Sequence, residues 1–163
     1  MPTEEEHAFV LAFLRLATAP NVKDGDICGA DALVGYWKIF SLTFDDVQFE
    51  IERMEKGGGS SLIATTTTTV TISNNTLQAL FPHLTSDKTV GTKGKVLAAK
   101  LLGQRLVMRG SVHFDWDDMN SQVVNMHTQL DLLTPLLHLL GNLEDVSRVF
   151  KNAFLHADCV SYC

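Results

Sequence analysis

The fold is decided by the stretch VQFEIERMEKGGGSSLIATTTTTVTIS, which occupies residues 47–73. Apolar and polar side chains alternate in its first six residues, as in a β-strand with one solvent-exposed face. The glycines and serine of residues 57–60 are typical of a tight turn between two strands. The threonine-rich residues 62–73 also contain Val70 and Ile72, so we interpret them as β-branched strand residues. The stretch therefore predicts a long β-hairpin.

Two helices are expected before this hairpin. Thr3 and Glu6 have the spacing of a capping box, and apolar residues follow them at helical spacing. Pro20 and the polar residues 21–26 are expected to end this first helix. A second helix is expected over residues 30–40, where leucine and aromatic residues share one side.

Short helices and a second hairpin are expected after it. Asn74 or Asn75 is suited to cap a short helix that stops near a proline, and residues 95–104 predict another helix. Residues 105–116 and 121–133 predict two long strands joined by the turn-rich sequence DDMN.

The C-terminal part predicts a broken helix. Thr134 and Pro135 are suited to the cap and the first position of a helix, Gly141 interrupts it, and Asn142 with Asp145 restarts it. The segment from Leu136 to Phe154 is rich in leucine, valine and phenylalanine. We expect it either to pack on its own sheet or to bury against a second copy of the chain.

Composition excludes several functional classes. The chain has 163 residues, 45% of them hydrophobic and 20% charged, and a formal net charge of −6. It lacks a basic run, so we expect no direct nucleic-acid binding and no attraction to an anionic membrane. It also lacks the pattern of a signal peptide and any apolar stretch long enough to span a bilayer. We expect an intracellular protein, cytoplasmic or nuclear.

Cysteine usage gives no sign of a metal or disulfide framework. Cys28, Cys159 and Cys163 show no CxxC spacing, and the six histidines form neither an HxH nor an HExxH motif. We therefore expect no metal and no cofactor, and the sequence assigns no role to the three thiols.

Two histidine–carboxylate pairs are candidate catalytic residues. His113 and Asp115 are two residues apart on an expected strand, and His127 and Asp131 are four apart, so each pair shares a strand face. Such a pair can act as a general base, and the two pairs together could hold a metal. The favoured interpretation is structural, because the alternation places these side chains opposite the apolar ones. They then face solvent or pair across strands.

Five apolar residues are candidates to line a ligand pocket: Phe13, Tyr36, Trp37, Phe40 and Met108. An aromatic wall suits a flat apolar ligand. Ordinary core packing is favoured for the aromatic residues of the second helix, because they recur at helical spacing.

The order of these elements resembles the nuclear transport factor 2-like (SnoaL-like) cone. Three local features carry the resemblance: residues 29–37, GADALVGYW, residues 47–51, VQFEI, and the hairpin from Phe114 to Val123. The resemblance implies an α+β fold, in which N-terminal helices pack on a strongly curved antiparallel sheet and a C-terminal helix follows. The length of the chain and the lack of a linker rich in proline or serine predict one domain over residues 1–163, with a frayed tail after about residue 156.

A narrower resemblance is carried by residues 132–146, LLTPLLHLLGNLEDV, together with residues 64–72 and 81–84. These segments are similar to the domain that follows basic leucine-zipper regions in oomycete transcription factors, and the resemblance covers roughly residues 25–154. It implies a regulatory or dimerising module within a DNA-binding protein. The chain itself has neither a basic region nor sustained leucine heptads.

Two functional hypotheses follow. The favoured one is a non-catalytic interaction module that forms a homodimer, or pairs with a related subunit, through its sheet face. The alternative is a pocket enzyme of the isomerase, dehydratase or hydrolase type, which uses one of the histidine–aspartate pairs. A domain that senses a small apolar ligand without turnover is a third possibility.

Overall fold

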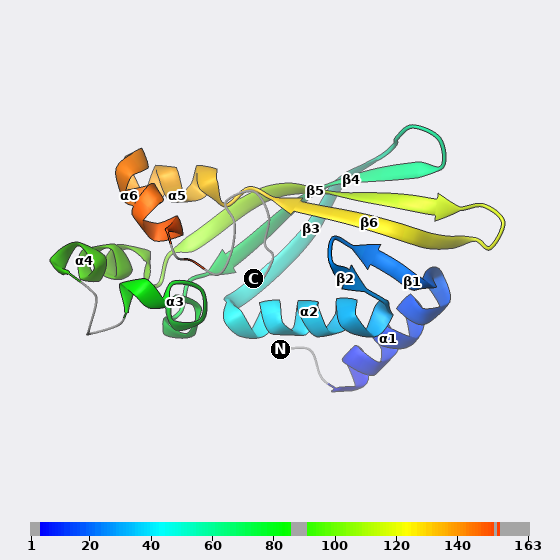
Figure 1. Cartoon of the computed structure of the whole chain (residues 1–163), viewed down its shortest axis with the longest axis horizontal. Coiled ribbons are helices and arrows are strands. Elements are labelled where there is room, and N and C mark those ends of the chain that lie inside the picture. The colour runs from blue at the N-terminus through cyan, green and yellow to red at the C-terminus, as the bar shows by residue number, and fades with distance from the viewer. Residues whose placement is uncertain (1–3, 86–90, 152, 154–163) are drawn as a thin grey trace. The chain divides into compact units, whose positions relative to one another are not determined.

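A computed structural model of the chain describes residues 4–85, 91–151 and 153. These residues form six α-helices, one short 3-10 helix and six strands (Figure 1). In chain order they are α1 (Glu4–Ala17), β1 (Thr18–Asp24), β2 (Ile27–Cys28), α2 (Ala30–Thr43), β3 (Asp45–Lys56), β4 (Ser61–Thr71), α3 (Asn74–Leu80), η1 (Pro82–Leu84), α4 (Thr92–Leu101), β5 (Arg105–Asp117), β6 (Gln122–Leu130), α5 (Leu133–Leu140) and α6 (Leu143–Phe150). The expected cap at Thr3 and the expected frayed tail lie outside the described residues. None of the helices described is long and apolar enough to cross a membrane.

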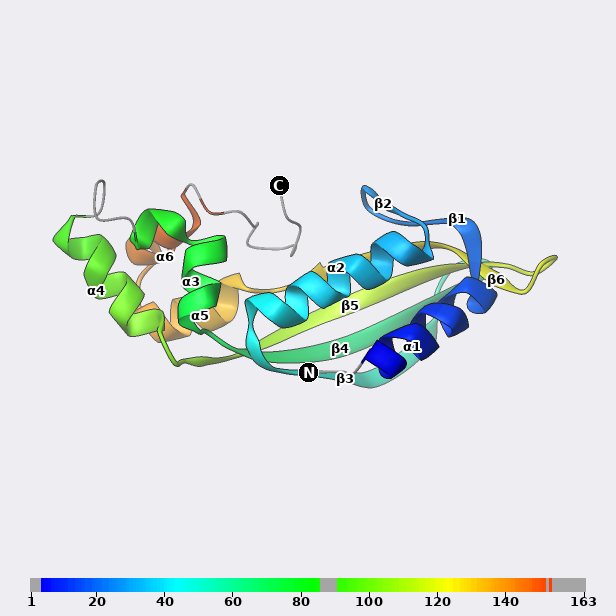
Figure 2. The ribbon, with the colours of Figure 1, turned by 90° about the horizontal axis from the view of Figure 1, so that it is seen from below.

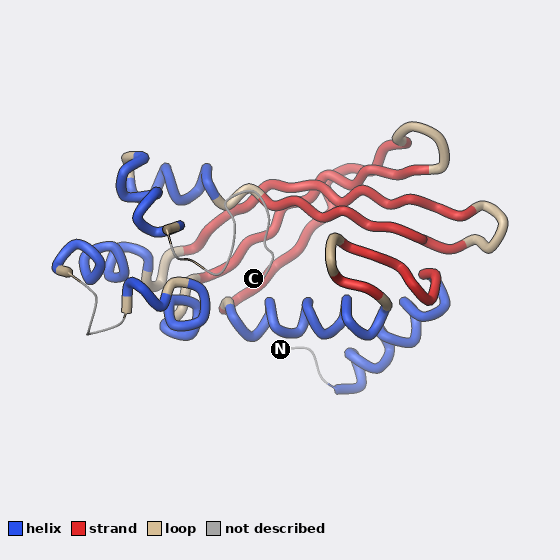
Figure 3. The backbone as a smooth tube through the Cα atoms, viewed as in Figure 1, coloured by secondary structure: helices blue, strands red, loops and turns tan. Residues whose placement is uncertain are grey.

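The strands follow the order β2-β1-β6-β5-β4-β3 in one sheet (Figure 3). The two predicted hairpins are β3–β4 and β5–β6. β1 pairs with β2 in the antiparallel sense but with β6 in the parallel sense, so the sheet is mixed. The α+β fold class predicted from the sequence is confirmed.

The strands β1 and β2 were not predicted, because the polar residues 21–26 were expected only to end the first helix. Val22 is fully buried in β1, and both carboxylate oxygens of Asp24 accept hydrogen bonds from Thr128 of β6. Gly25 turns the chain with a φ of +60°. The buried residues of β1 do not alternate regularly, so the strand has no period-two signal in the sequence.

The chain divides into two compact units, each assembled from separate segments. The described part of unit 1 comprises residues 4–42, 51–66 and 111–128. Its core is built by five buried residues from α2 and four strands: Val22, Leu33, Ala64, Val112 and Met126. Ile27, Phe114 and Val123 pack against this cluster.

The described part of unit 2 comprises residues 43–50, 67–85, 91–110, 129–151 and 153. Within it α4 contacts both η1 and α5, and α5 contacts α6 (Figure 2). Each of its helices buries leucine or valine side chains, among them Leu77, Leu80, Leu97, Leu101, Leu136, Leu140, Val146 and Val149.

The helix caps differ in part from the expected ones. Ser73, rather than either asparagine, caps α3 in a capping box with Thr76. The prediction that Thr134 caps the C-terminal helix is wrong, because Thr134 lies inside α5 and its own N–H donates to Asp131. Two predictions are confirmed: Gly141 ends α5 with a φ of +82°, and Asn142 caps α6 by accepting from the N–H of Asp145.

The edge strand β3 is more exposed than its alternating sequence predicts. Its pattern suggested that Phe49 and Ile51 belong to a buried face, but both side chains are exposed. Among the described residues β3 is the last strand in the sheet order, with β4 as its paired neighbour.

Glycine at position 110 is required by the close approach of β5 and β6. A Cβ atom there would overlap the carbonyl oxygen of Gln129, which is backbone and cannot rotate away. Gly110→Ala should therefore lower the free energy of unfolding by about 1–3 kcal/mol, as overpacking does elsewhere. Gly35→Ala in α2 is the matched control, since nothing lies within 4 Å of its added Cβ. It should raise the free energy of unfolding by about 0.5–1 kcal/mol. Urea unfolding curves of both variants check these opposite signs.

The β5–β6 turn is organised by one carboxylate. Asp117 accepts from the side-chain amide of Asn120 at 2.7 Å and from the N–H of Met119 at 2.9 Å. The hydrogen bond from Asn120 is the main cause that lowers the pKa of Asp117 below its ordinary value. A depressed pKa in the folded state means that the charged carboxylate stabilises the fold. This stabilisation is present above the unfolded-state pKa and is lost as the pH falls through the folded-state pKa.

Asn120→Ala removes the strongest of these hydrogen bonds and should raise the pKa of Asp117 toward its ordinary value. A carboxyl-detected NMR pH titration measures this pKa directly. An unchanged titration curve in the variant would show that the Asn120 side chain does not stabilise the charged form.

Candidate functional site

The His113–Asp115 pair lies on the exposed face of β5. The buried side chains of this strand are Leu106, Met108 and Val112, and the two polar residues alternate with them. Asp115 accepts a hydrogen bond from Asn125 of β6 at 3.1 Å. This cross-strand contact fits the structural interpretation of the pair.

The side chains of His127 and Asp131 have different surroundings. His127 is exposed, whereas both oxygens of Asp131 accept hydrogen bonds from Thr134 at the start of α5. Among the described residues, no histidine of either pair is hydrogen-bonded to its carboxylate. The described part of the chain also holds no group of three His, Cys, Asp or Glu residues arranged for a metal.

The five residues proposed to line a pocket are not brought together around the one described below. Phe13 is exposed and Trp37 is partly exposed, whereas Phe40 and Met108 are buried and Tyr36 is half-buried. Their role in binding an apolar ligand stays a prediction.

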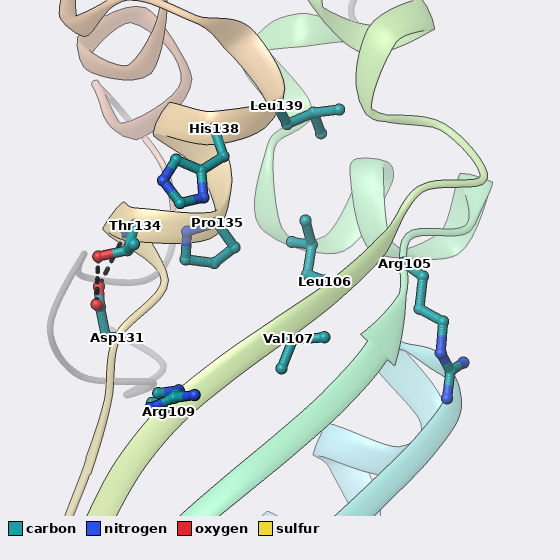
Figure 4. A pocket seen from close by; sticks show the side chains of 9 residues that line it. All are labelled: Arg105, Leu106, Val107, Arg109, Asp131, Thr134, Pro135, His138 and Leu139. Carbon is teal, nitrogen blue, oxygen red and sulfur yellow. Dashed lines mark hydrogen bonds between the residues drawn. The ribbon is translucent and has the colours of Figure 1, made fainter.

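A pocket of about 500 Å³ lies in unit 2, beside the start of β5 and the helix α5 (Figure 4). Its apolar side is formed by Leu106, Val107, Pro135 and Leu139. The polar residues of the lining are Arg105, Arg109, Asp131, Thr134 and His138.

Backbone contacts fix the position of this pocket. The N–H of Asp131 donates to the carbonyl oxygen of Arg109 at 2.8 Å, which places the start of α5 against β5. The Asp131 carboxylate then holds Thr134 through two hydrogen bonds, drawn in Figure 4. The side chains on the two elements are therefore held in a fixed relation.

The charged side chains of the pocket differ in how many hydrogen-bond partners they have within the described chain. The Asp131 carboxylate is fully engaged with Thr134, and Arg105 makes one long hydrogen bond of 3.4 Å to Thr71. Within the described part of the chain, the guanidinium of Arg109 has no ion pair and no hydrogen bond. The two arginines and one aspartate leave a formal charge of +1 in a chain whose net charge is −6.

Sequence reasoning did not find Arg105, Arg109 or His138. The alternation RLVMR does predict that both arginines share the exposed face of the strand. That they line one pocket with His138 depends on how α5 returns to β5, which the sequence pattern does not specify.

A second candidate interaction surface, formed by exposed apolar side chains, lies in unit 1 on α1. Phe9, Phe13 and Leu16 follow a spacing of four and three residues, so they share one face of the helix. Their exposed fractions are 74%, 60% and 80%.

The same helix is tied to α2 by one ion pair. Arg15 donates to a carboxylate oxygen of Asp31 at 2.7 Å, and both side chains are exposed. An exposed pair of this kind contributes little to stability.

Comparison with solved structures identifies the fold class. A SnoaL-like polyketide cyclase from Agrobacterium tumefaciens superimposes with a TM-score of 0.55 and 14% identity, over 86% of this chain and 100% of that one. A protein named as a SnoaL-like polyketide cyclase from a Jannaschia species gives 0.53 and 13%, over 81% and 79% of the two chains. IdmH from Streptomyces antibioticus gives 0.50 and 15%, over 83% and 90%. The chain has the SnoaL-like, nuclear transport factor 2-like fold predicted from the sequence.

Comparison with family models gives one more specific similarity. The model of the BZIP transcription factor 1 C-terminal domain matches residues 2–43. The sequence suggested the same kind of domain, but from segments that lie mainly further along the chain. No curated protein matches the sequence.

Asp131 is expected to matter for stability rather than for proton transfer. Asp131→Ala leaves the first turn of α5 without its side-chain acceptor and should lower the free energy of unfolding by about 0.5–2 kcal/mol. Asp115→Ala is the control, an exposed strand carboxylate whose loss should cost less than about 0.5 kcal/mol. Urea unfolding of the two variants measures both values. Equal values for the two variants would contradict the stabilising role of the Asp131–Thr134 hydrogen bonds.

Proposed function

We propose that the chain is a non-catalytic interaction module of a transcription regulator and that it forms a homodimer. The observation that carries this proposal is the exposed apolar face of α1, formed by Phe9, Phe13 and Leu16. This face lies within residues 2–43, the segment that is similar to the transcription factor domain.

The geometry of this face favours a second copy as its partner. A single helix face can pair with the same face of another copy about a two-fold axis, which is the commonest symmetry of soluble oligomers. Three large apolar side chains at helical spacing are the anchors that helix pairing uses.

The energies are compatible with a moderate affinity. Complete burial of one such side chain contributes about 1.5–3 kcal/mol, and two copies bring three side chains each. Association costs about 4–15 kcal/mol in lost freedom of motion. The apolar side chains of α1 are therefore sufficient for a weak to moderate dimer without a large additional interface.

The similarity to a bZIP protein supports the same conclusion. The basic regions of bZIP proteins extend from a coiled-coil dimer, so domains attached to them occur in pairs at high local concentration. A modest apolar face is sufficient under that condition. In this proposal the protein is intracellular and acts in the nucleus, and contacts with DNA are made outside this chain.

The alternative, a pocket enzyme of the isomerase or dehydratase type, is less well supported. Its hydrogen-bonded acid–base pair is not formed by the described residues, and both oxygens of Asp131 accept hydrogen bonds from Thr134 in the first turn of α5. The fold alone does not favour it, because one fold hosts enzymes and binding modules alike.

Charge substitutions on two surfaces test the dimer. Phe13→Glu should shift the chain to monomer in sedimentation velocity at about 50 µM, a concentration at which a dimer with a micromolar dissociation constant is mostly formed. Ile51→Glu places the same charge on β3 and tests the expectation that the sheet face forms the interface. Met119→Glu is the control, since this side chain is 92% exposed and lies in the β5–β6 turn, outside both tested surfaces.

Each outcome has a definite meaning. Loss of the dimer in Phe13→Glu alone supports α1 as the interface, and loss in Ile51→Glu alone moves the interface to the sheet. A wild-type chain that sediments only as a monomer overturns the homodimer. Circular dichroism confirms that each variant remains folded.

A further inference from the structure

We infer that the pocket between β5 and α5 in unit 2 binds an amphipathic carboxylate, a molecule with one carboxylate group on an apolar body. The inference is independent of the dimer proposed above, because it rests on different residues in the other unit. Neither the fold nor the similarity to a transcription factor domain assigns a role to this pocket.

The size and lining of the pocket suit a small molecule. Its volume of about 500 Å³ is within the range of about 300–1,000 Å³ that small-molecule sites occupy. The lining combines four apolar residues, Leu106, Val107, Pro135 and Leu139, with five polar ones. A site that joins apolar and polar groups can hold an amphipathic ligand.

The polar side selects an anion. Arg109 carries a guanidinium that has no partner within the described chain, and it lines the pocket together with His138 of α5. Arg105 also belongs to the lining, but its side chain points away from these two (Figure 4). A guanidinium presents parallel N–H donors that match the two oxygens of a carboxylate. The imidazole of His138 adds a donor from α5.

The charge balance favours a carboxylate over a phosphate. Asp131 lies in the same lining, so the two arginines and this carboxylate together carry a formal charge of +1. A monoanion neutralises this charge, whereas a dianion would leave an excess negative charge beside Asp131. Asp131 also occupies the start of α5, so the helix end is not itself available to an anion.

The pocket is preorganised to receive its ligand. The backbone hydrogen bond from Asp131 to Arg109 joins the two elements that carry the lining, and Leu106 and Leu136 anchor these elements in the core of unit 2. Binding therefore requires only the ordering of the Arg109 and His138 side chains, which lowers its entropic cost.

Naphthoate and its neutral amide, naphthamide, are the probes that test this inference. Backbone nitrogen–proton NMR spectra of the full chain are recorded during titration with each compound. Naphthoate should give saturable shifts at residues 105–109 and 131–139, and naphthamide should bind at least about tenfold more weakly because it forms no charge-assisted hydrogen bonds.

Four variants locate the anion. Arg109→Gln should weaken naphthoate binding about tenfold. Arg109→Lys should bind more tightly than Arg109→Gln but more weakly than the wild type, because lysine keeps the positive charge without the two parallel N–H donors. Asp131→Asn should strengthen binding by removing a repulsive charge. The matched control is Arg53→Gln, since Arg53 is an exposed arginine of β3 paired with Glu55 at 2.8 Å. It removes the same charge and should leave binding unchanged.

Several results would overturn the inference. These are the absence of saturable shifts, equal binding of the acid and the amide, equal loss in Arg53→Gln and Arg109→Gln, or shifts confined to α1. The spectra also show whether each variant is folded, so a loss of binding is separated from a loss of structure.

Discussion

The alternation of side chains along a strand is the constraint on which the rest of the structure depends. On β5 it buries Leu106, Met108 and Val112 and turns Arg105, Val107 and Arg109 outward. The same rule on β6 buries Met126 and Leu130 and exposes His127. One geometric rule therefore removes the histidines from the apolar interior and supplies the arginines of the pocket. Few polar groups therefore lie on the buried face of these strands. On β4 they are the hydroxyls of Thr66 and Thr68, which are buried and have no hydrogen-bond partner among the described residues.

Local polar residues that suggest chemistry are largely engaged by the backbone. Asp131 holds the start of α5, Asn142 caps α6, Ser73 caps α3, and Asp117 organises a turn. Helix starts leave N–H groups without partners, and short polar side chains satisfy them at a gain of about 1 kcal/mol each. A carboxylate beside a helix start is therefore weak support for catalysis. Side chains that are left without a partner are more informative about function.

The sequence predicted the helices and strands that have a strong local periodicity. It did not predict those whose structure depends on pairing with a distant segment. The β3–β4 and β5–β6 hairpins, α2 and the break at Gly141 were predicted because alternation, helical spacing and glycine act locally. β1 was missed because its strand character depends on pairing with β6, some hundred residues away in the chain. The exposure of Phe49 could not be predicted either, because the alternation of a strand does not reveal whether it lies at an edge.

The candidate sites follow the same division. The histidine–aspartate pairs were visible as spacings, but a spacing does not show which partner each side chain prefers. Arg109 was visible only as an exposed strand residue, and its meaning comes from the apolar side chains beside it and from the lack of a hydrogen bond or ion pair within the described chain. A guanidinium beside exposed apolar side chains suits an amphipathic anion, because one ligand can contact both groups. On α1 the exposed Phe9, Phe13 and Leu16 carry the cost of contact with water. Within the described chain both surfaces are exposed to solvent, and these are the surfaces to which the two proposals assign a ligand and a second copy.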